Sequence, residues 1–314
     1  MKRPLGNSGI SIAPLVFGGN VFGWTADRQR SFELLDRFVE AGLNAIDTAD
    51  VYSTWAPGNQ GGESETIVGE WMKTRGNRDR IVVITKVGMA MPDGKGLSAA
   101  WIERAVEDSL RRLQTDYIDL YFSHVYDAEV PVEETLQAYE RLISAGKVRS
   151  IGASNHDAGQ LAEALKSARD NGLPRYEVLQ PEYNLVDRAN YEGALRELAI
   201  SEGLGVITYY SLASGFLSGK YRSKQDLDKS PRGAGIAKYL DERGLRVLAA
   251  LDAVAAAHGA TLAEVALAWL MAREGVSAPI ASATRLDQLE SLVRSTQLSL
   301  SAEDIQMLTD AGAQ

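Results

Sequence analysis

Four side chains that can hold or transfer a proton stand at the ends of short apolar runs in this sequence. Asp47 ends one such run and Tyr52 follows it closely, Lys86 ends the next run, and His124 follows the one after that. If these runs are parallel strands of a barrel, their carboxyl ends lie on one rim, which is where barrel active sites are built. The spacing therefore predicts that the four side chains converge.

The chemistry open to these residues is proton-assisted reduction of a carbonyl group. A phenol ionises near about pH 10, and an ammonium beside it favours the phenolate, so Lys86 would make Tyr52 a better proton donor near neutrality. A carbonyl that accepts hydride becomes an alkoxide, which Tyr52 could protonate while His124 donates a hydrogen bond that orients the oxygen. Asp47 would pair with Lys86 and limit the cost of burying its charge.

Each of these residues also has an ordinary structural explanation. An isolated aspartate, lysine or tyrosine in a barrel is usually part of a surface ion pair or a packed interface. A lone histidine after an apolar strand is more often a structural residue with satisfied hydrogen bonds. The spacing alone does not choose between these explanations and a catalytic group.

The elements that would position these side chains are short β-branched runs, which alternate with longer segments of helical periodicity. This alternation is typical of repeated βα units around a parallel sheet. Eight units can be distinguished, so the sequence predicts an α/β fold, a closed (β/α)8 TIM barrel, in a single domain that spans residues 1–314. The predicted strands are Leu15–Phe17, Asn44–Asp47, Ile81–Thr85, Ile118–Phe122, Val148–Ala153, Val178–Gln180, Gly205–Tyr209 and Ser277–Ala281.

Segments outside these units have patterns of their own. Lys2–Leu5 and Ile10–Ala13 flank a Gly-Asn-Ser-Gly turn, which predicts an N-terminal β-hairpin that closes the bottom of the barrel. Ser223–Gly235 is polar and rich in glycine and proline, which indicates a mobile loop. Ser98 is a predicted helix N-cap, and Ser301–Thr309 is a predicted last helix.

The composition argues against several classes of partner and site. The chain has 33 Lys and Arg against 42 Asp and Glu, a net charge of −9, so we expect neither nucleic acids nor membrane surfaces as partners. No apolar run reaches the ~18 residues of a transmembrane helix, and no signal peptide is evident, so we expect a cytoplasmic protein. The chain has no cysteine and its 3 histidines are far apart, so no metal site is predicted.

Several longer motifs resemble those of the aldo-keto reductase family. Asp47–Tyr52, followed by Gly62–Gly69, is similar to the family signature around its catalytic aspartate and tyrosine. Ile84–Lys86, Ser109–His124 and Gly146–Asn155 resemble further family motifs, and the resemblance covers nearly the whole chain. It implies the barrel, the hairpin below it and the same four catalytic residues.

The resemblance also implies a cofactor, NADPH (NADP+), bound at the rim. Neither a Gly-x-Gly-x-x-Gly motif after a strand nor a Gly-x-x-x-x-Gly-Lys-Ser/Thr phosphate loop occurs, so another binding mode is required. Ser154, Asn155 and Gln180 match the positions that hydrogen-bond the nicotinamide carboxamide, and Tyr209 matches the aromatic that stacks on its ring. Taken alone, Ser154 and Asn155 could be a helix cap and Tyr209 a core residue.

Further cofactor contacts are implied for three segments. The segment after the seventh strand resembles the loop that wraps the pyrophosphate, and which hydroxyl among Tyr210, Ser211 and Ser214 meets the phosphate stays open. Small residues let backbone amides approach closely there. The implied residues in this loop are Tyr210, Ser211, Leu212, Ser214, Gly215 and Lys220. Gly18, Gly19, Asn20 and Asp47 would lie near the nicotinamide and its ribose, although the glycines could equally be plain turn residues.

The segment after the eighth strand resembles the one that receives the adenosine 2′-phosphate. Arg285 is expected to select NADPH over NADH, because its guanidinium can fork onto the phosphate and no acidic residue stands at that position to bind a ribose diol. Where the family commonly has Glu-Asn, this chain has Ser291-Leu292, which removes expected contacts to the adenine. The residues implied at this end are Ser282, Thr284, Arg285 and Gln288.

The substrate is expected to be a small aldehyde or ketone in a partly apolar pocket. The expected lining residues are Phe22, Trp24, Tyr52, Trp55, His124 and Tyr126. The alternative is a nucleotide-binding regulatory subunit with little turnover, because the resemblance extends to potassium-channel β-subunits and a fold does not by itself settle function.

Overall fold

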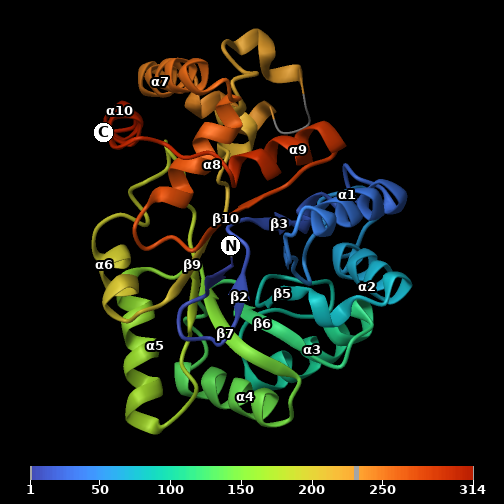
Figure 1. The fold of residues 1–314 in the computed structure, drawn as a ribbon. Coiled ribbons are helices and arrows are strands. Elements are labelled where there is room, and N and C mark those ends of the chain that lie inside the picture. Colours follow the sequence, from blue (N-terminus) through green and yellow to red (C-terminus); the bar gives the residue numbers. More distant parts are fainter. Residues whose placement is uncertain (1, 230–232, 314) are drawn as a thin grey trace.

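Parallel strands close into an eight-stranded barrel in the computed structural model, which describes residues 2–229 and 233–313 (Figure 1). Neighbouring strands follow the order β10-β3-β4-β5-β6-β7-β8-β9, so each strand pairs with the next and the last returns to the first. The strands are β3 Val16–Gly18, β4 Ala45–Asp47, β5 Val82–Val87, β6 Ile118–Ser123, β7 Val148–Ser154, β8 Val178–Gln180, β9 Gly205–Thr208 and β10 Ala278–Ala281. The predicted (β/α)8 barrel is confirmed.

Strand ends agree with the prediction to within two residues. The strand β5 continues through Lys86 to Val87, and Lys86 is in register with Phe122 of β6. The lysine therefore belongs to the ladder itself instead of following it, because main-chain pairing continues after the apolar run has stopped. At the other side of the barrel β9 stops at Thr208, which leaves Tyr209 at the start of the following loop.

Helices pack around the outside of the barrel (Figure 1). Ser98 caps α3 by accepting a hydrogen bond from the backbone of Trp101, as predicted. α7 and α10 pack against each other beside α8 and lie outside the simple alternation of strand and helix. The helices are α1 Arg28–Glu40, α2 Glu63–Arg75, α3 Ala99–Leu113, α4 Val132–Ser144, α5 Ala158–Asn171, α6 Ala194–Ser201, α7 Glu242–His258, α8 Leu262–Ala272, α9 Leu286–Ser295 and α10 Ala302–Ala311.

The N-terminal hairpin covers the end of the barrel opposite the catalytic rim. β1 Arg3–Pro4 and β2 Ser11–Ile12 pair in antiparallel fashion, as predicted. Gly6 has a φ of 56°, and a Cβ there would lie 2.3 Å from the backbone nitrogen of Gly205, so both the turn and the close approach to β9 require glycine. The barrel floor is thus sealed by the chain itself.

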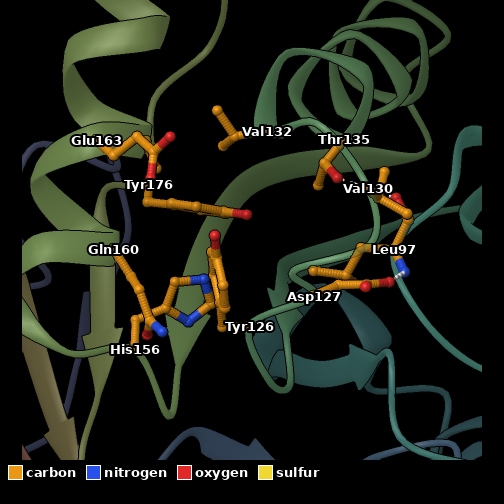
Figure 2. Close-up of a pocket in the computed structure, with 11 residues that line it drawn as sticks. Leu97, Tyr126, Asp127, Val130, Val132, Thr135, His156, Gln160, Glu163 and Tyr176 are labelled. Atoms are coloured by element: carbon orange, nitrogen blue, oxygen red, sulfur yellow. Dashed lines mark hydrogen bonds between the residues drawn. The ribbon is translucent and has the colours of Figure 1, made fainter.

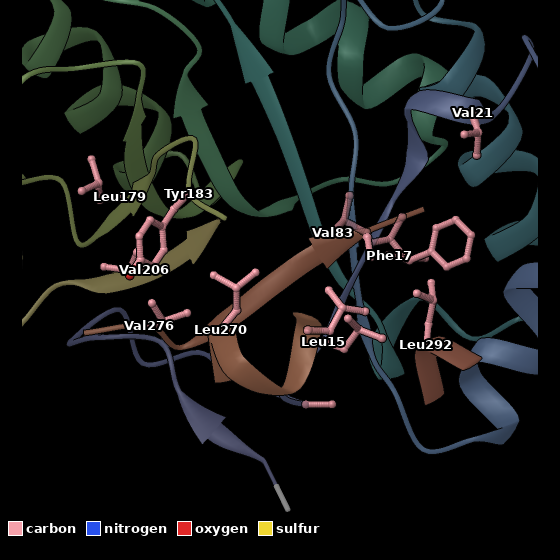
Figure 3. Packing of buried hydrophobic residues seen from close by; sticks show 14 of the residues in the cluster. Leu15, Phe17, Val21, Val83, Leu179, Tyr183, Val206, Leu270, Val276 and Leu292 are labelled. Atoms are coloured by element: carbon pink, nitrogen blue, oxygen red, sulfur yellow. The ribbon is translucent and has the colours of Figure 1, made fainter. Parts of the chain in front are cut away.

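Apolar side chains fill both the inside of the barrel and the layer between barrel and helices. Along β3, Val16 belongs to the inner cluster, while its neighbour Phe17 belongs to the outer one. Figure 3 shows this outer layer, where Leu15 and Phe17 lie near Leu292 of α9. Because the described side chains fill the interior, we expect a ligand to bind at the rim instead of inside the barrel.

The described residues of the loop between β9 and α7 include short helical turns. Within the predicted mobile loop 223–235, residues 230–232 lie outside the described part, and short 3-10 helices occupy Lys224–Lys229 and Gly233–Tyr239. The Tyr239 hydroxyl donates to Asp187 Oδ2 at 2.5 Å, which ties this loop to the segment after β8. Among the described residues no single helix is long and apolar enough to cross a bilayer, and α7 and α8 meet that test only as a pair bent by 95°.

Candidate active site

The structure brings the four predicted catalytic side chains together at the carboxyl ends of β4, β5 and β6. The fully buried ammonium of Lys86 lies 2.7 Å from Asp47 Oδ2, 2.8 Å from the carbonyl oxygen of Thr48 and 2.9 Å from the Tyr52 hydroxyl. That hydroxyl in turn donates to Asp47 Oδ2 at 3.1 Å. The His124 ring stands edge-on to the Tyr52 ring, with centroids 6.0 Å apart.

The segment after β4 holds Tyr52 on a tight turn. The Thr48 amide donates to the carbonyl oxygen of Ile84 at 2.8 Å, which extends the pairing with β5 by one step. Ser53 has a φ of 75°, an uncommon conformation for a residue with a side chain, and its buried hydroxyl donates to the carbonyl oxygen of Phe22 at 2.6 Å. These contacts fix both ends of the turn, so the phenol is directed back over the rim.

The charges around Lys86 act differently from the sequence-based expectation. Burial lowers the pKa of Lys86, and the Asp47 carboxylate opposes this shift. Burial raises the pKa of Tyr52 well above 10, and Asp47 raises it further. The expectation that Lys86 brings the Tyr52 pKa below its ordinary value is therefore wrong for this structure, because burial of the phenol raises this pKa and the Asp47 carboxylate reinforces the rise.

His124 is held as a neutral imidazole. Its side chain is buried, and its Nδ1 atom has no hydrogen-bond partner among the described residues. Burial, and secondarily the charge of Lys86, lowers the His124 pKa well below 6.5. A neutral ring keeps one N–H donor at physiological pH, which is the form needed to hydrogen-bond a carbonyl oxygen.

The residues expected at the nicotinamide form one chain of hydrogen bonds that begins at Asp47. Gln180 Nε2 donates to Asp47 Oδ1 at 2.9 Å, and the Ser154 hydroxyl donates to the carbonyl oxygen of Gln180 at 2.9 Å. Asn155 Nδ2 donates to the Ser154 hydroxyl at 3.1 Å, and the Tyr209 hydroxyl donates to Asn155 Oδ1 at 2.6 Å. The rim thus presents amide groups and a partly exposed aromatic ring, a donor set suited to a planar carboxamide and its ring.

The loop after β9 has an unusual run of left-handed residues. Tyr210, Ala213 and Ser214 have φ values of 52°, 47° and 57°, and Gly215 has 101°. Non-glycine residues pay a steric cost in this region, and such strain concentrates at ligand-binding loops. The hydroxyl of Ser211 is buried and donates to the carbonyl oxygen of Thr208 at 2.9 Å, so it is already used within the fold.

The glycines at the end of β3 have a structural role of their own. A Cβ on Gly18 would lie 2.5 Å from the Ser282 hydroxyl oxygen, and one on Gly19 would lie 2.9 Å from the carbonyl oxygen of Asp47. The Ser282 hydroxyl also donates to Asn20 Oδ1 at 2.7 Å. Close packing between the ends of β3, β4 and β10 therefore requires these glycines, whatever binds above them.

At the far end of the rim Arg285 is exposed and paired within its own segment. Its Nε and Nη2 atoms each lie 2.9 Å from a carboxylate oxygen of Asp287. The backbone amide of Thr284 donates to Gln288 Oε1 at 2.9 Å. Ser291 donates to Glu264 Oε1 at 2.8 Å, so its side chain joins α9 to α8.

The expected substrate residues divide into three groups. The Trp55 ring is exposed and contacts the Trp24 and Tyr52 rings, with centroids 5.8 and 6.0 Å away, so these aromatics stand beside the catalytic residues. The prediction that Phe22 lines the substrate pocket is wrong, because its ring is fully buried and stacks on the Phe17 ring, with centroids 5.2 Å apart. Tyr126 lines a separate pocket.

This separate pocket lies between α4 and α5 and is small. Tyr126, His156 and Tyr176 point toward one another along one side of it, and Val132 and Thr135 line the other side (Figure 2). The space inside it admits roughly one water molecule. A carbonyl substrate does not fit there.

The sequence analysis missed Asp50, a second buried carboxyl behind the catalytic residues. Its Oδ1 atom accepts a hydrogen bond from the Val51 amide at 2.7 Å, whereas Oδ2 has no partner among the described residues. Burial, and secondarily Glu65, raises the Asp50 pKa to about 8. The neighbouring Glu65 differs, because Arg112 and Thr85 satisfy both its oxygens at 2.6 Å. Burial and the unpaired Oδ2 atom therefore favour the protonated form of Asp50 near neutral pH.

We expect Asp50→Asn to stabilise the protein at alkaline pH. Because the folded-state pKa is raised above the unfolded value, wild-type stability falls as pH rises from about 4 to about 8, by about 1.4 kcal/mol per pH unit. The asparagine variant lacks this fall, so its advantage over wild type should grow by up to about 4 kcal/mol between pH 5 and pH 8. Urea denaturation at both pH values measures the free energy of unfolding of the two proteins. If the variant differed from wild type by the same amount at pH 5 and pH 8, Asp50 would be ionised in the folded protein at both pH values.

Comparison with known proteins identifies the family of this chain. The sequence matches the Aldo/keto reductase family over residues 14–313. It is 33% identical to the uncharacterized oxidoreductase YrpG of Bacillus subtilis, over 98% of this chain and 94% of that protein. It is 31% identical to the aryl-alcohol dehydrogenase (NADP+) of Phanerodontia chrysosporium, over 96% and 83% of the two chains. A probable voltage-gated potassium channel subunit beta of Oryza sativa is 36% identical over 91% and 88%. The chain therefore belongs to the aldo/keto reductase family.

Proposed function

We propose that this protein is an NADPH-dependent oxidoreductase that reduces an aldehyde or ketone to an alcohol. The observation that carries the proposal is the contact of one buried ammonium, Lys86, with both the Asp47 carboxylate and the Tyr52 hydroxyl, at 2.7 and 2.9 Å. A lysine that only formed a surface ion pair would stay exposed to solvent, whereas the Lys86 side chain is fully buried. The relatives named as oxidoreductases, among them the aryl-alcohol dehydrogenase (NADP+), support the same reaction class.

In the proposed mechanism the chain supplies the proton and the orientation. When bound, the reduced nicotinamide supplies a hydride to the carbonyl carbon. His124, as a neutral imidazole, donates a hydrogen bond to the carbonyl oxygen, and Tyr52 gives that oxygen its proton. Since the Tyr52 hydroxyl donates to Asp47 in this structure, its proton must turn from the carboxylate to the substrate. Lys86 then stabilises the phenolate that remains.

The rim residues fit the cofactor. Ser154, Asn155 and Gln180 would hold the carboxamide, and the ring of Tyr209 would support the nicotinamide. The left-handed backbone at Ser214 and its neighbours would expose amides to the pyrophosphate, with Lys220 in the same loop. Such positioning would hold one face of the ring toward the carbonyl carbon.

Turnover measurement tests this proposal directly. NADPH oxidation is followed with a panel of aliphatic and aromatic aldehydes and ketones, and NADPH binding is measured in parallel by fluorescence. Carbonyl-dependent oxidation of NADPH supports the enzyme. Binding without turnover across the panel would instead support a second candidate, a nucleotide-binding regulatory subunit, which the similarity to the rice potassium channel subunit keeps in view.

We expect His124→Ala to lower turnover by about 10²-fold or more, with a loss that differs between substrates because orientation is affected. His124→Gln, which keeps an N–H donor, should recover part of this loss. Because the His124 pKa is well below 6.5, the wild-type pH profile should show no histidine inflection between pH 6 and pH 8. An unchanged rate for His124→Ala across all substrates would mean that the histidine only supports the structure.

A further inference from the structure

We propose that Asp287 sets the cofactor preference by competing with the 2′-phosphate of NADPH for the guanidinium of Arg285. Under this proposal the protein binds NADPH only modestly more tightly than NADH. The inference rests on the proposed function, because it concerns a cofactor that the function requires. It differs from the sequence-based expectation that Arg285 alone makes the protein prefer NADPH over NADH.

The arginine and the aspartate form a two-pronged ion pair. Arg285 Nε lies 2.9 Å from Asp287 Oδ1, and Nη2 lies 2.9 Å from Oδ2. This fork is the geometry in which a guanidinium binds a carboxylate or a phosphate through parallel hydrogen bonds. A phosphate that used the same two nitrogens would have to displace the carboxylate.

The beginning of α9 explains why the pair forms. Arg285 is the N-cap residue, in extended backbone with φ −140°, and its side chain makes no capping hydrogen bond. Asp287 lies in the first helical turn, where an acidic side chain is favoured by the helix dipole. Two residues of separation bring the carboxylate within reach of the guanidinium.

Both side chains are open to solvent. Their exposed fractions are 63% for Arg285 and 68% for Asp287. An exposed pair of this kind is weak, so a phosphate can displace the carboxylate, although at a cost in affinity. Asp287 should therefore reduce NADPH binding without preventing it.

Two other arginines at α9 are engaged by other acids. Arg37, from the neighbouring helix α1, contacts Glu290 at 2.6 Å, and Arg294 contacts Glu264 at 2.7 Å (Figure 1). Among the described residues, the acid that pairs with the Arg285 guanidinium is Asp287. Pairing with Asp287 weakens the local attraction for a phosphate, whose charge is about −2.

Arg285 should favour the binding of NADPH, whereas Asp287 should favour the binding of NADH. A free Arg285 favours NADPH, whose phosphate it can bind. The Asp287 carboxylate repels that phosphate, whereas it can accept a hydrogen bond from the ribose 2′-hydroxyl of NADH, as acidic residues do in other dinucleotide sites. The ratio of the two affinities therefore reports on Asp287.

Fluorescence titration of NADPH and NADH tests the proposal on wild type and three variants. Asp287→Asn should lower the NADPH dissociation constant by about 3-fold to 10-fold and leave NADH unchanged or weaker. Arg285→Ala should raise the NADPH constant by about one to two powers of ten while NADH barely moves. The matched control is Glu290→Gln, which removes the same charge from the same helix without touching Arg285, and it should change either constant less than about 2-fold.

The outcomes separate this inference from the proposed function. If wild type binds neither cofactor, both fail. If both cofactors bind but Asp287→Asn behaves like Glu290→Gln, or shifts NADPH and NADH equally, the competition is absent while the proposed function stands. A gain for NADPH alone that shrinks as salt is added supports the competition, because exposed charges are screened.

Discussion

Replacement of Tyr52 by phenylalanine should reduce carbonyl-dependent NADPH oxidation by about 10²-fold to 10⁴-fold, the usual contribution of a positioned general acid. Only the hydroxyl is lost, so hydride can still be delivered but the alkoxide has no proton donor. Dissociation constants for NADPH and substrate should stay near wild type, which places the loss in the catalytic step. Steady-state kinetics and cofactor titration on the same preparation measure both.

The fold should tolerate this change. Without the phenol, the Lys86 ammonium keeps its contacts with Asp47 and with the carbonyl oxygen of Thr48, at 2.7 and 2.8 Å. A matched control is Tyr117→Phe, which removes the same atom from a ring that lies against the guanidinium groups of Arg78 and Arg149, outside the site. The control should turn over normally, and a Tyr52→Phe variant that matched it would rule out Tyr52 as the proton donor.

Much of the fold could be predicted because the barrel repeats one simple pattern. Each β-branched run must be buried on both faces, and each following segment has one apolar stripe, so alternation along the chain translates into strand and helix. The same logic predicted that Asp47, Lys86 and His124 would lie on one rim, since the carboxyl ends of parallel strands share it. Residues 44–47 and 178–180 were predicted to within one residue for this reason.

Other features depend on three-dimensional neighbours that periodicity does not show. Phe22 looked like a rim aromatic, yet it turns inward onto the core. The direction of the Tyr52 pKa shift depends on burial and on a second contact with Asp47, which a pairwise argument about Lys86 leaves out. Asp50 gave no sequence signal beyond its nearness to Asp47, because an acid becomes unusual only when it is found buried and half-unsatisfied.

Replacement of Lys86 by methionine should lower turnover by about 10²-fold or more, because the Tyr52 phenolate formed during proton transfer would lose its counter-charge. Asp47 would keep hydrogen bonds from Tyr52 and Gln180 but would become a buried carboxylate without a cation. Breaking a buried ion pair from one side typically costs about 3–5 kcal/mol of stability. The single variant therefore confounds two effects, a lost catalytic charge and a weakened fold.

A double variant separates these effects. Asp47→Asn combined with Lys86→Met leaves no unpaired charge, so urea denaturation should show that much of the lost stability returns. Turnover should stay low, because the ammonium that stabilises the phenolate is still absent. If turnover returned together with stability, Lys86 would be a structural cation and the proton would reach the substrate without its help. If stability returned alone, the Lys86–Asp47 pair would be needed for the chemistry itself, which is the result we expect from the contacts of both residues with the Tyr52 hydroxyl.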